Sequence, residues 1–341
     1  MTAALDIVAT GMVTAVGLDA PSSCAALRAR LDGFKETQYA DDEGEWLLGS
    51  PVTMPRKWIG QKRMTHMLAA AISEICTTVP QARERTPMLL CLPEASRPGS
   101  PVQDASALVR NVCAILEMAV DPRSRTISHG RPSGLVALEQ ARRLLAEGGT
   151  SAVIVAGVDS YLTPEAIGFY LANRRLLATN NPNGFIPGEA AAAVLCTHAG
   201  HGSGLRLHGL GLARENAYIY NEADEPLRGD GLTTAYRHAL KEAGIEMNQL
   251  GFRISDLIGE QYWFKQTALA SLRLVRGAHD FQDLWSPGES LGNIGAAAVP
   301  VMIGMAFAAA RKGYAAGNPV LIEASEDSGA CGAAIFAARA A

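Results

Sequence analysis

The sequence predicts an α/β protein in which one helix–strand unit occurs twice. Apolar segments of strand length alternate with amphipathic segments of helix length along most of the 341 residues. When residue 132 is placed over residue 300, the segments 132–160 and 300–328 align without a gap and end in the same Asp-Ser pair. Two alanine-rich helix–strand units could resemble each other by chance, but the ungapped match favours a duplication.

Each copy of this unit follows the same local rules. A proline stands in the first helical turn, where its missing N–H removes no hydrogen bond, and a glycine ends the helix. The strand that follows is apolar on both faces, as parallel strands between two helical layers are. The identical positions are Pro132/Pro300, Ala141/Ala309, Arg143/Arg311, Gly149/Gly317, Ile154/Ile322, Ala156/Ala324, Asp159/Asp327 and Ser160/Ser328.

The remaining elements are expected from the same patterns. The first half is expected to hold strands at Leu5–Val13, Pro87–Leu92, Arg125–Ser128 and Ala190–Thr197, and helices at Pro21–Leu31, Met64–Val79 and Pro101–Ala119. The second half is expected to hold strands at Leu205–Ala213, Ile254–Gly259 and Gly332–Ala338, and helices at Thr233–Ala243 and Tyr262–Val275. The sequence thus predicts two α/β halves, 1–200 and 201–341, with the segment Tyr161–Gly188 as a cap over a central site.

Composition excludes several classes of function. Hydrophobic residues make up 48% and charged residues 19% of the chain, which is typical of a compact globule. The net charge of −4 argues against binding to nucleic acid or to an anionic membrane. The segment Ile294–Ala310 is apolar, but it is short and contains Pro300, so a buried helix is expected instead of a membrane span.

The cysteines point to a cytoplasmic protein without a metal site. All six lie singly in apolar runs and lack the spacing of metal ligands, so reduced, buried thiols are expected. The first residues, MTAALDIVATG, carry no basic region and run into a strand, so no signal peptide is expected. No cofactor is expected either.

A tight turn between a strand and a helix is the main candidate for a functional site. The strand Arg125–Ser128 runs into Gly130-Arg131-Pro132-Ser133-Gly134, and a helix follows at once. Such a junction commonly raises a nucleophile onto a helix N-terminus, yet here Arg131 stands at its top. His129 could act as a base and Ser133 as a nucleophile. Hydrogen bonding to the turn by His129 and capping of the helix by Ser133 are the favoured alternatives.

Four segments, in this order, resemble β-ketoacyl-ACP synthases of the thiolase superfamily. They are the opening strand LDIVATGMVTAVG (Leu5–Gly17), the helix–strand unit SGLVALEQARRLLAEGGTSAVIVAGVDS (133–160), NGFIPGEAAAAVL (Asn183–Leu195) and GNIGAAAVP (Gly292–Pro300). The resemblance implies a thiolase-like fold, in which two duplicated α/β halves pack as a five-layered αβαβα sandwich.

The resemblance also implies a site from which this chain departs. Family members carry a cysteine on the helix N-terminus, a pair of histidines or a histidine and an asparagine, and an oxyanion hole of two backbone N–H groups. The corresponding positions are Arg131 for the cysteine, Glu260 for the first histidine and Asn293 for the second. The oxyanion gate falls on Glu326-Asp327-Ser328-Gly329-Ala330. Only Asn293 is retained.

These substitutions predict an ion pair in place of the acyl pocket. A cation at a helix N-terminus opposes the helix dipole, so a buried Arg131 needs an acidic partner, which Glu260, Glu326 or Asp327 could supply. Carboxylates at the gate would also repel the negative charge of an oxyanion. The aromatic run Tyr262-Trp263-Phe264 could cover this pocket, face a partner or pack in the core.

We therefore expect a pseudoenzyme that has lost the condensing residues and serves as an accessory, adaptor or scaffold protein. The resemblance implies a homodimer through the edge strand 123–128, and a protein partner such as a synthase, an acyl carrier protein or a secreted effector. Chain-length factors and synthase-like proteins of type VI secretion are precedents within the family. The alternative is an acyltransferase that acts on acyl-ACP or acyl-CoA through a non-standard residue, His129 or Ser133.

Overall fold

The strands form one mixed sheet with ten members and a separate two-stranded hairpin. The computed structural model of the chain describes residues 4–200, 204–221, 223, 225–277 and 282–338. The order across the sheet is β10 (Asp283–Trp285), β9 (Phe252–Ser255), β11 (Val320–Ser325), β12 (Ala330–Ala338), β8 (Leu205–Arg214), β1 (Leu5–Val13), β7 (Glu189–His198), β6 (Ala152–Ser160), β4 (Met88–Leu92) and β5 (Arg125–Ser128).

The sheet consists of two groups of five strands with the same spatial order. In each group the first strand in the chain lies at the junction, and the third lies at the outer edge. Among the described residues, the strands of the two groups pair with each other where Leu5–Ile7 of β1 lie beside Leu205–Leu207 of β8. Strand β6 runs parallel to β4 and antiparallel to β7, and β11 runs parallel to β9 and antiparallel to β12. The two helix–strand units found in the sequence therefore occupy the same place in each group.

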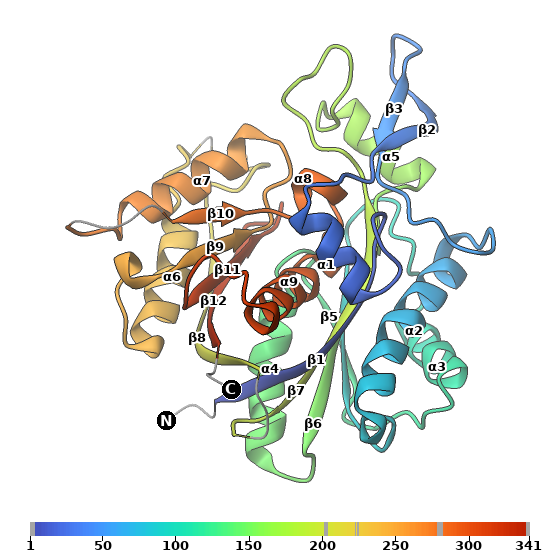
Figure 1. Cartoon of the computed structure of the whole chain (residues 1–341). Coiled ribbons are helices and arrows are strands. Elements are labelled where there is room, and N and C mark those ends of the chain that lie inside the picture. Colours follow the sequence, from blue (N-terminus) through green and yellow to red (C-terminus); the bar gives the residue numbers. More distant parts are fainter. Residues whose placement is uncertain (1–3, 201–203, 222, 224, 278–281, 339–341) are drawn as a thin grey trace.

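Helices cover both faces of the two groups and give the expected five layers (Figure 1). The outer layers are α2 (Gly60–Thr78) with α3 (Ala105–Ile115), and α6 (Asp230–Ala243) with α7 (Gln261–Leu272). The central layer holds α1 (Ala20–Arg28), α4 (Ser133–Glu147) and α9 (Ala298–Lys312). Separate apolar clusters fill the spaces between these layers.

The centre of the molecule is the contact between α4 and α9, the helices of the two units. A Cβ atom on Gly134 would lie 2.6 Å from Cβ of Val299, so only glycine permits this approach. Most of α9 is buried between the strand layers, as expected for the segment Ile294–Ala310. No helix in the described part of the chain is both long and apolar enough to span a membrane.

The predicted elements are confirmed, with three kinds of difference. Strands β1 and β5 have the predicted bounds, and the others shift by a few residues. Strand β9 ends at Ser255 instead of Gly259, because the chain leaves the sheet there to bring Asp256 towards the centre. The sequence did not predict β2 (Lys35–Ala40), β3 (Trp46–Gly49), α5 (Pro164–Ala172), β10 or α8 (Gly288–Leu291).

The segment Tyr161–Gly188 lies beside the β2–β3 hairpin and contains α5. Its side chains form a fourth apolar cluster with Leu47 of the hairpin and Trp263 of α7. Trp263 in turn contacts Arg131, so this segment packs near the turn that precedes α4.

Candidate functional site

The turn between β5 and α4, residues 130–134, is held tightly against the C-terminal half. We call this turn the elbow. Gly130 has φ +63°, and a Cβ atom there would lie 1.9 Å from Oε2 of Glu326. Its N–H donates to the carbonyl oxygen of Leu92 at 3.2 Å. Glycine is required at this position for both its backbone conformation and its contact.

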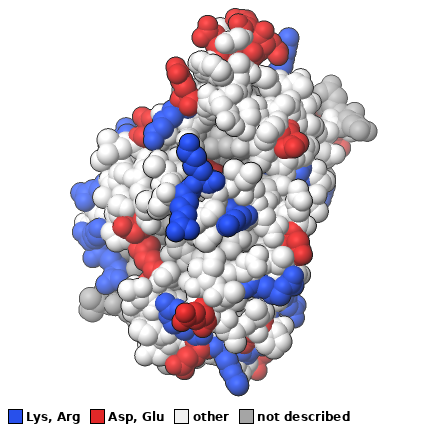
Figure 2. All heavy atoms as spheres, turned by 90° about the vertical axis from the view of Figure 1, so that its right-hand side faces the viewer, with Lys and Arg blue, Asp and Glu red and all other residues white. Residues whose placement is uncertain are grey.

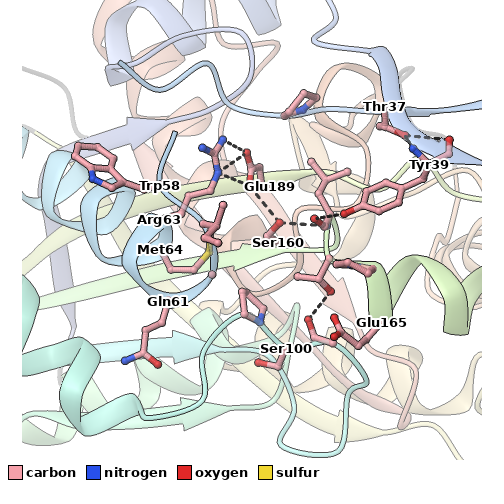
Figure 3. A pocket seen from close by; sticks show the side chains of 18 of the residues that line it. Thr37, Tyr39, Trp58, Gln61, Arg63, Met64, Ser100, Ser160, Glu165 and Glu189 are labelled. Atoms are coloured by element: carbon pink, nitrogen blue, oxygen red, sulfur yellow. Dashed lines mark hydrogen bonds and ion pairs between the residues drawn. The ribbon is translucent and has the colours of Figure 1, made fainter. Parts of the chain in front are cut away.

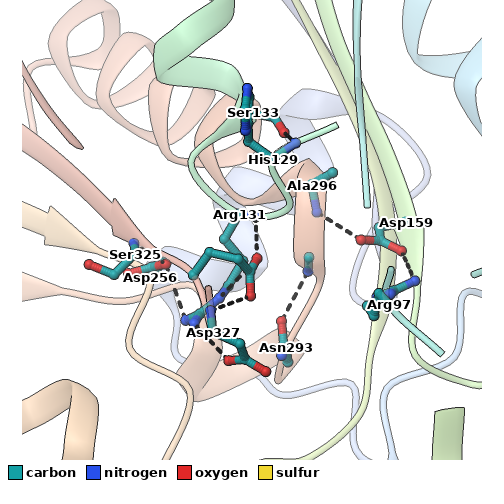
Figure 4. A network of polar contacts seen from close by, with 12 residues as sticks. Arg97, His129, Arg131, Ser133, Asp159, Asp256, Asn293, Ala296, Ser325 and Asp327 are labelled. Atoms are coloured by element: carbon teal, nitrogen blue, oxygen red, sulfur yellow. Dashed lines mark hydrogen bonds and ion pairs between the residues drawn. The ribbon is translucent and has the colours of Figure 1, made fainter. Parts of the chain in front are cut away.

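Arg131 points into the protein, and its side chain is 1% exposed (Figure 4). Its Nη1 lies 3.2 Å from Oδ2 of Asp256, its Nη2 lies 3.7 Å from Oδ1 of Asp327, and its Nε lies 3.8 Å from Oε2 of Glu326. The guanidinium carbon is 4.0 Å from the centre of the Trp263 ring, a cation–π contact. The prediction that Arg131 pairs with one of the acids Glu260, Glu326 or Asp327 is thus confirmed, through Glu326 and Asp327, and Asp256 is an additional partner.

The side chain of Glu326 also accepts hydrogen bonds from backbone N–H groups, one of them in the elbow. Its Oε2 accepts a hydrogen bond from the N–H of Arg131 at 2.7 Å, and its Oε1 accepts one from the N–H of Asp327 at 2.8 Å. Burial raises the pKa of Glu326 to about 8, against the opposing effect of Arg131 and with a further increase from Asp327. Burial likewise raises the pKa of Asp256 to about 6, although Arg131 lowers it.

A second arginine completes this network. Arg175, from the segment Tyr161–Gly188, pairs with Glu260 through two nitrogens, one of them 2.8 Å from Oε2. Its Nη1 and Nη2 lie 3.0 and 3.1 Å from the two carboxylate oxygens of Asp327. Asp327 therefore bridges Arg131 and Arg175. We call these two arginines with Asp256, Glu260, Glu326 and Asp327 the central ion network.

Glu260, the third acid that the sequence offered as a partner for Arg131, pairs with Arg175 instead. Glu260 binds Arg175 and accepts a hydrogen bond from Nε1 of Trp263 at 2.9 Å. Arg175 was not found from the sequence, because it lies in an irregular stretch of Arg and Asn residues with no local pattern of its own. Its burial depends on tertiary contacts with Glu260 and Asp327, far away in the chain.

Asp159, at the end of β6, makes contacts similar to those of the acids that follow β11. Asp159, which aligns with Asp327 in the repeat, pairs with Nη2 of Arg97 at 2.6 Å. Its Oδ2 accepts a hydrogen bond from the N–H of Ala296, just before α9, at 2.9 Å. An acid at the end of β6 thus binds the backbone ahead of α9, while Glu326, after β11, binds the backbone ahead of α4. The two halves cap each other reciprocally.

The other predicted site residues lie around this network with different roles. Asn293 is buried, and its Oδ1 accepts a hydrogen bond from the N–H of Gly295 at 3.1 Å. Ser328 and Gly329 form the turn in which the N–H of Gly329 donates to the carbonyl oxygen of Glu326 at 2.8 Å. The side chain of His129 is exposed and lies away from the central ion network (Figure 4).

Ser133 does not cap α4, contrary to the favoured interpretation. Its hydroxyl accepts a hydrogen bond from the N–H of His129 at 2.9 Å and donates to the carbonyl oxygen of Leu92 at 3.3 Å. The hydroxyl therefore ties the ends of β4 and β5 together. Its two contacts are with backbone groups, and neither is a base that could activate it.

The cysteines also offer no reactive group. All six are buried, and burial raises the pKa of each thiol. A thiol whose pKa is raised carries little thiolate at neutral pH and is a poor nucleophile.

In the described ranges no group of three or more His, Cys, Asp or Glu residues is arranged to hold a metal ion. Arg131 and its three acidic partners form a buried, charged cluster.

Comparison with known proteins identifies the architecture. Residues 108–200 match the family described as beta-ketoacyl synthase, N-terminal domain. A ketosynthase in complex with its chain length factor from Xenorhabdus doucetiae is similar with a TM-score of 0.79 and 15% identity, over 99% of this chain and 98% of that chain. A type II polyketide synthase ketosynthase in complex with its acyl carrier protein gives 0.81 and 14%, over 99% and 100%.

A beta-ketoacyl synthase from Burkholderia phymatum is also similar, with a TM-score of 0.73 and 15% identity over 100% of both chains. At sequence identities this low, the structural similarity shows a shared fold but not a shared activity. Together with the strand order and the layers, they show that this chain has the α/β thiolase-like fold of the ketosynthases, built on a mixed ten-stranded sheet.

Proposed function

We propose that this protein is a ketosynthase-like pseudoenzyme that has given up condensation and acts by binding a protein partner. The observation that carries the proposal is the buried arginine at the elbow, the position that the sequence resemblance aligns with the nucleophilic cysteine of active synthases. Arg131 makes contacts with three acids, so it is an integral part of the core.

The arrangement of Glu326 supports the loss of acyl chemistry. In the active relatives that this chain resembles, the backbone N–H of the nucleophile stabilises the oxyanion. Here the equivalent N–H, that of Arg131, donates to the carboxylate of Glu326. A carboxyl group at this place blocks the donor and, when ionised, repels a developing negative charge. We infer that neither the nucleophile nor the oxyanion hole remains.

The outer edge of β5 supports an assembly of two subunits. Strand β5 is the last strand of the sheet, pairs only with β4 within the described chain, and has three exposed residues out of four. An unpaired edge strand is a template for pairing with another chain. We propose that residues 123–128 pair with a second subunit. Solved structures with this fold include a ketosynthase bound to its chain length factor and one bound to an acyl carrier protein.

The proposal also includes the division of the chain into a duplicated pair of halves, 1–200 and 201–341. It is supported by the equal strand order and by the aligned residues Asp159 and Asp327, which each pair with arginine. Expression of the two halves as separate polypeptides tests it. Co-purification of the halves as one folded complex is expected, and failure of the pair to associate would argue against the boundary.

Intact-mass spectrometry tests the loss of acyl transfer. The protein is incubated with a panel of acyl-CoA and acyl-ACP donors, and no acyl adduct is expected. A stoichiometric adduct that disappears in His129→Ala or Ser133→Ala would overturn the proposal and establish the acyltransferase alternative. Size-exclusion chromatography with light scattering, with and without a co-expressed partner, then distinguishes a homodimer from a heterodimer.

A further inference from the structure

A small pocket lies where α1 meets β10, α8 and α9, on the part of the molecule that these elements form in Figure 1. Its volume is about 240 Å³. This is smaller than the pockets that enclose drug-sized ligands, so it suits a ligand built on a single ring. None of the residues that line it belongs to the elbow or to the central ion network. Any binding here is therefore separate from the proposed loss of condensation.

One wall of this small pocket is aromatic. Trp285, the last residue of β10, packs on Phe252 of β9 with ring centres 4.6 Å apart. Tyr314 follows the glycine that ends α9, and its N–H donates to the carbonyl oxygen of Ala309 at 3.0 Å. The rings of Trp285 and Tyr314 are nearly parallel, at 26°, with centres 6.4 Å apart. Two rings that the fold holds in place offer a surface on which an aromatic ligand can pack.

Two arginines at the end of α1 give the pocket a positive charge. Arg28 is the last residue of α1, and its guanidinium carbon lies 4.2 Å from the centre of the Tyr314 ring. Arg30 follows in the left-handed conformation, with φ +54°, and it also lines the pocket. Among the described residues neither arginine forms an ion pair. The lining holds two arginines and one acid, the exposed Glu289, so it favours an anion.

The arginine of a larger groove differs in this respect. That groove, of about 960 Å³, lies beside the β2–β3 hairpin, and Arg63 lines it (Figure 3). Nε of Arg63 lies 3.0 Å from Oε2 of Glu189, which also lines the groove. Its charge is thus neutralised within the protein, whereas the charges of Arg28 and Arg30 are available to a ligand.

The inner wall of the small pocket is apolar and carries one free hydroxyl. Cys24, Leu27 and Met305 are buried there. Burial raises the pKa of the Cys24 thiol to about 12, so this wall is uncharged at neutral pH. Ser290 is 4% exposed, and within the described chain its hydroxyl has no hydrogen-bond partner. Because buried hydroxyl groups are normally paired, the hydroxyl of Ser290 is suited to bind a polar atom of a ligand.

From these features we propose that the small pocket binds a small aromatic carboxylate. The ring of the ligand packs on Trp285 and Tyr314, and its carboxylate pairs with Arg28 and Arg30. A guanidinium group suits this role, because its planar set of donors matches the two oxygens of a carboxylate. A neutral aromatic molecule would leave both arginines unpaired, and an aliphatic acid would lose the contact with the two rings.

Isothermal titration calorimetry with 3-phenylpropionate tests this binding, in a buffer of low ionic strength because salt screens exposed charges. Two analogues separate the contributions of charge and ring. We expect 3-phenylpropionamide, which is uncharged, to bind about tenfold more weakly or worse. We expect 3-cyclohexylpropionate, which keeps the charge but lacks the aromatic ring, to bind about threefold more weakly or worse.

Two variants test whether the ligand occupies this pocket. Arg28→Met keeps an apolar stem without the charge. Arg30→Gly removes the second guanidinium, and glycine adopts the left-handed conformation at residue 30 without strain, so this variant is expected to fold. Each should weaken the binding of 3-phenylpropionate about threefold or more. Circular dichroism verifies that both are folded.

Two control variants should bind 3-phenylpropionate within about twofold of the unaltered protein. Arg110→Met removes an arginine that is 63% exposed on α3, on a face where acidic and basic groups are interspersed (Figure 2). Ile59→Glu places a charge in the larger groove, where Ile59 is 83% exposed.

The absence of binding at the solubility limit of 3-phenylpropionate would overturn the proposal. Equal binding of either analogue would do the same, as would unchanged binding to the folded Arg30→Gly variant. Weakened binding to Ile59→Glu alone would place the ligand in the larger groove and would also overturn it.

Discussion

The carboxylate of Glu326 and the backbone N–H of Arg131 are joined by a 2.7 Å hydrogen bond that closes the elbow from the opposite half of the protein. The same carboxylate lies where a Cβ atom of residue 130 would stand. The sequence Gly130-Arg131 and the acid at 326 are therefore one structural unit. A side chain at residue 130 would displace the carboxyl group of Glu326 and weaken its hydrogen bond to Arg131.

Gly130→Ala should destabilise the protein far more than a matched glycine substitution. Gly244, at the end of α6, also has a positive φ (+69°), in the left-handed region, but a Cβ atom there has no neighbour within 4 Å. Gly244→Ala should cost about 1–2 kcal/mol of unfolding free energy, from backbone conformation alone. Gly130→Ala adds a collision with Glu326, and chemical denaturation should give a loss larger by about 1–3 kcal/mol. Equal losses in the two variants would show that Glu326 does not press on the elbow.

Arg131→Met should be strongly destabilising because it leaves buried carboxylates without their counter-charge. We expect a loss of about 3–5 kcal/mol in urea unfolding, monitored by tryptophan fluorescence. Arg143→Met is the control on the helix that follows the elbow, since Arg143 is 70% exposed and pairs with Glu139 on the surface. That variant should change stability by about 1 kcal/mol or less. A fully stable Arg131→Met protein would contradict a compensating role of the guanidinium.

The stability of the protein should fall as the pH rises towards 8. Glu326 has a pKa near 8 in the folded protein, against an ordinary value of 4.5, so the folded state holds a proton that the unfolded state has lost. Its contribution is full below about pH 4.5 and disappears as the pH passes about 8. The slope from this group is at most about 1.4 kcal/mol per pH unit.

Glu326→Gln should flatten this profile, because an amide cannot titrate. The comparison uses the slope of unfolding free energy against pH and not the absolute stability. An amide at 326 offers only one acceptor oxygen to the N–H groups of Arg131 and Asp327, so the variant also loses a hydrogen bond at every pH. An unchanged slope would mean that Glu326 is ionised throughout this range in the folded protein.

Arg131→Cys should not restore acyl transfer. The new thiol would stand at the elbow, but the backbone N–H of residue 131 would still be bonded to Glu326, and acids would still surround the site. Intact-mass spectrometry with acyl-CoA donors should therefore find no stable acyl adduct. Thermal unfolding by circular dichroism verifies that the variant is folded. Stoichiometric acylation of a folded Arg131→Cys protein would refute the conclusion that the acids close the pocket.

If β5 pairs with a second subunit, the backbone amides of residues 125–128 should exchange slowly with deuterium. Exchange is measured at two protein concentrations, above and below the dissociation constant found by light scattering. Strand β2, an edge strand outside the proposed interface, serves as the internal reference. Dilution should speed exchange in β5 and leave β2 unchanged, whereas a concentration-independent rate in β5 would exclude this edge as the interface.

Local sequence patterns predicted most of the fold because its central strands and helices are apolar with clear periodicity. Strand β1 and helix α4 are clear examples, with buried residues at the positions that their periods require. The β2–β3 hairpin was not predicted, since KETQYA is polar on both faces and only its tertiary setting makes it a strand. Strand β10 has three residues, too few to give a pattern.

The site could be predicted only in part, for the same reason. A buried arginine needs acidic partners, so the sequence predicted that Arg131 pairs with a nearby acid in the fold. Which acid binds which arginine depends on distances across the fold, so the sequence left three acids open as partners of Arg131 and did not predict Arg175 as the partner of Glu260. Asp256 was considered as part of a strand, and its role became visible only where β9 ends.

The reciprocal capping by Asp159 and Glu326 has a consequence for the lifetime of the protein in a cell. Asp159 accepts a hydrogen bond from the backbone ahead of α9, and Glu326 accepts one from the backbone ahead of α4. Partial opening of one half should expose both turns together, so proteases would meet either an intact molecule or a wholly opened one. Degradation should then proceed without a long-lived fragment, and the abundance of the protein would respond sharply to any substitution at these two acids.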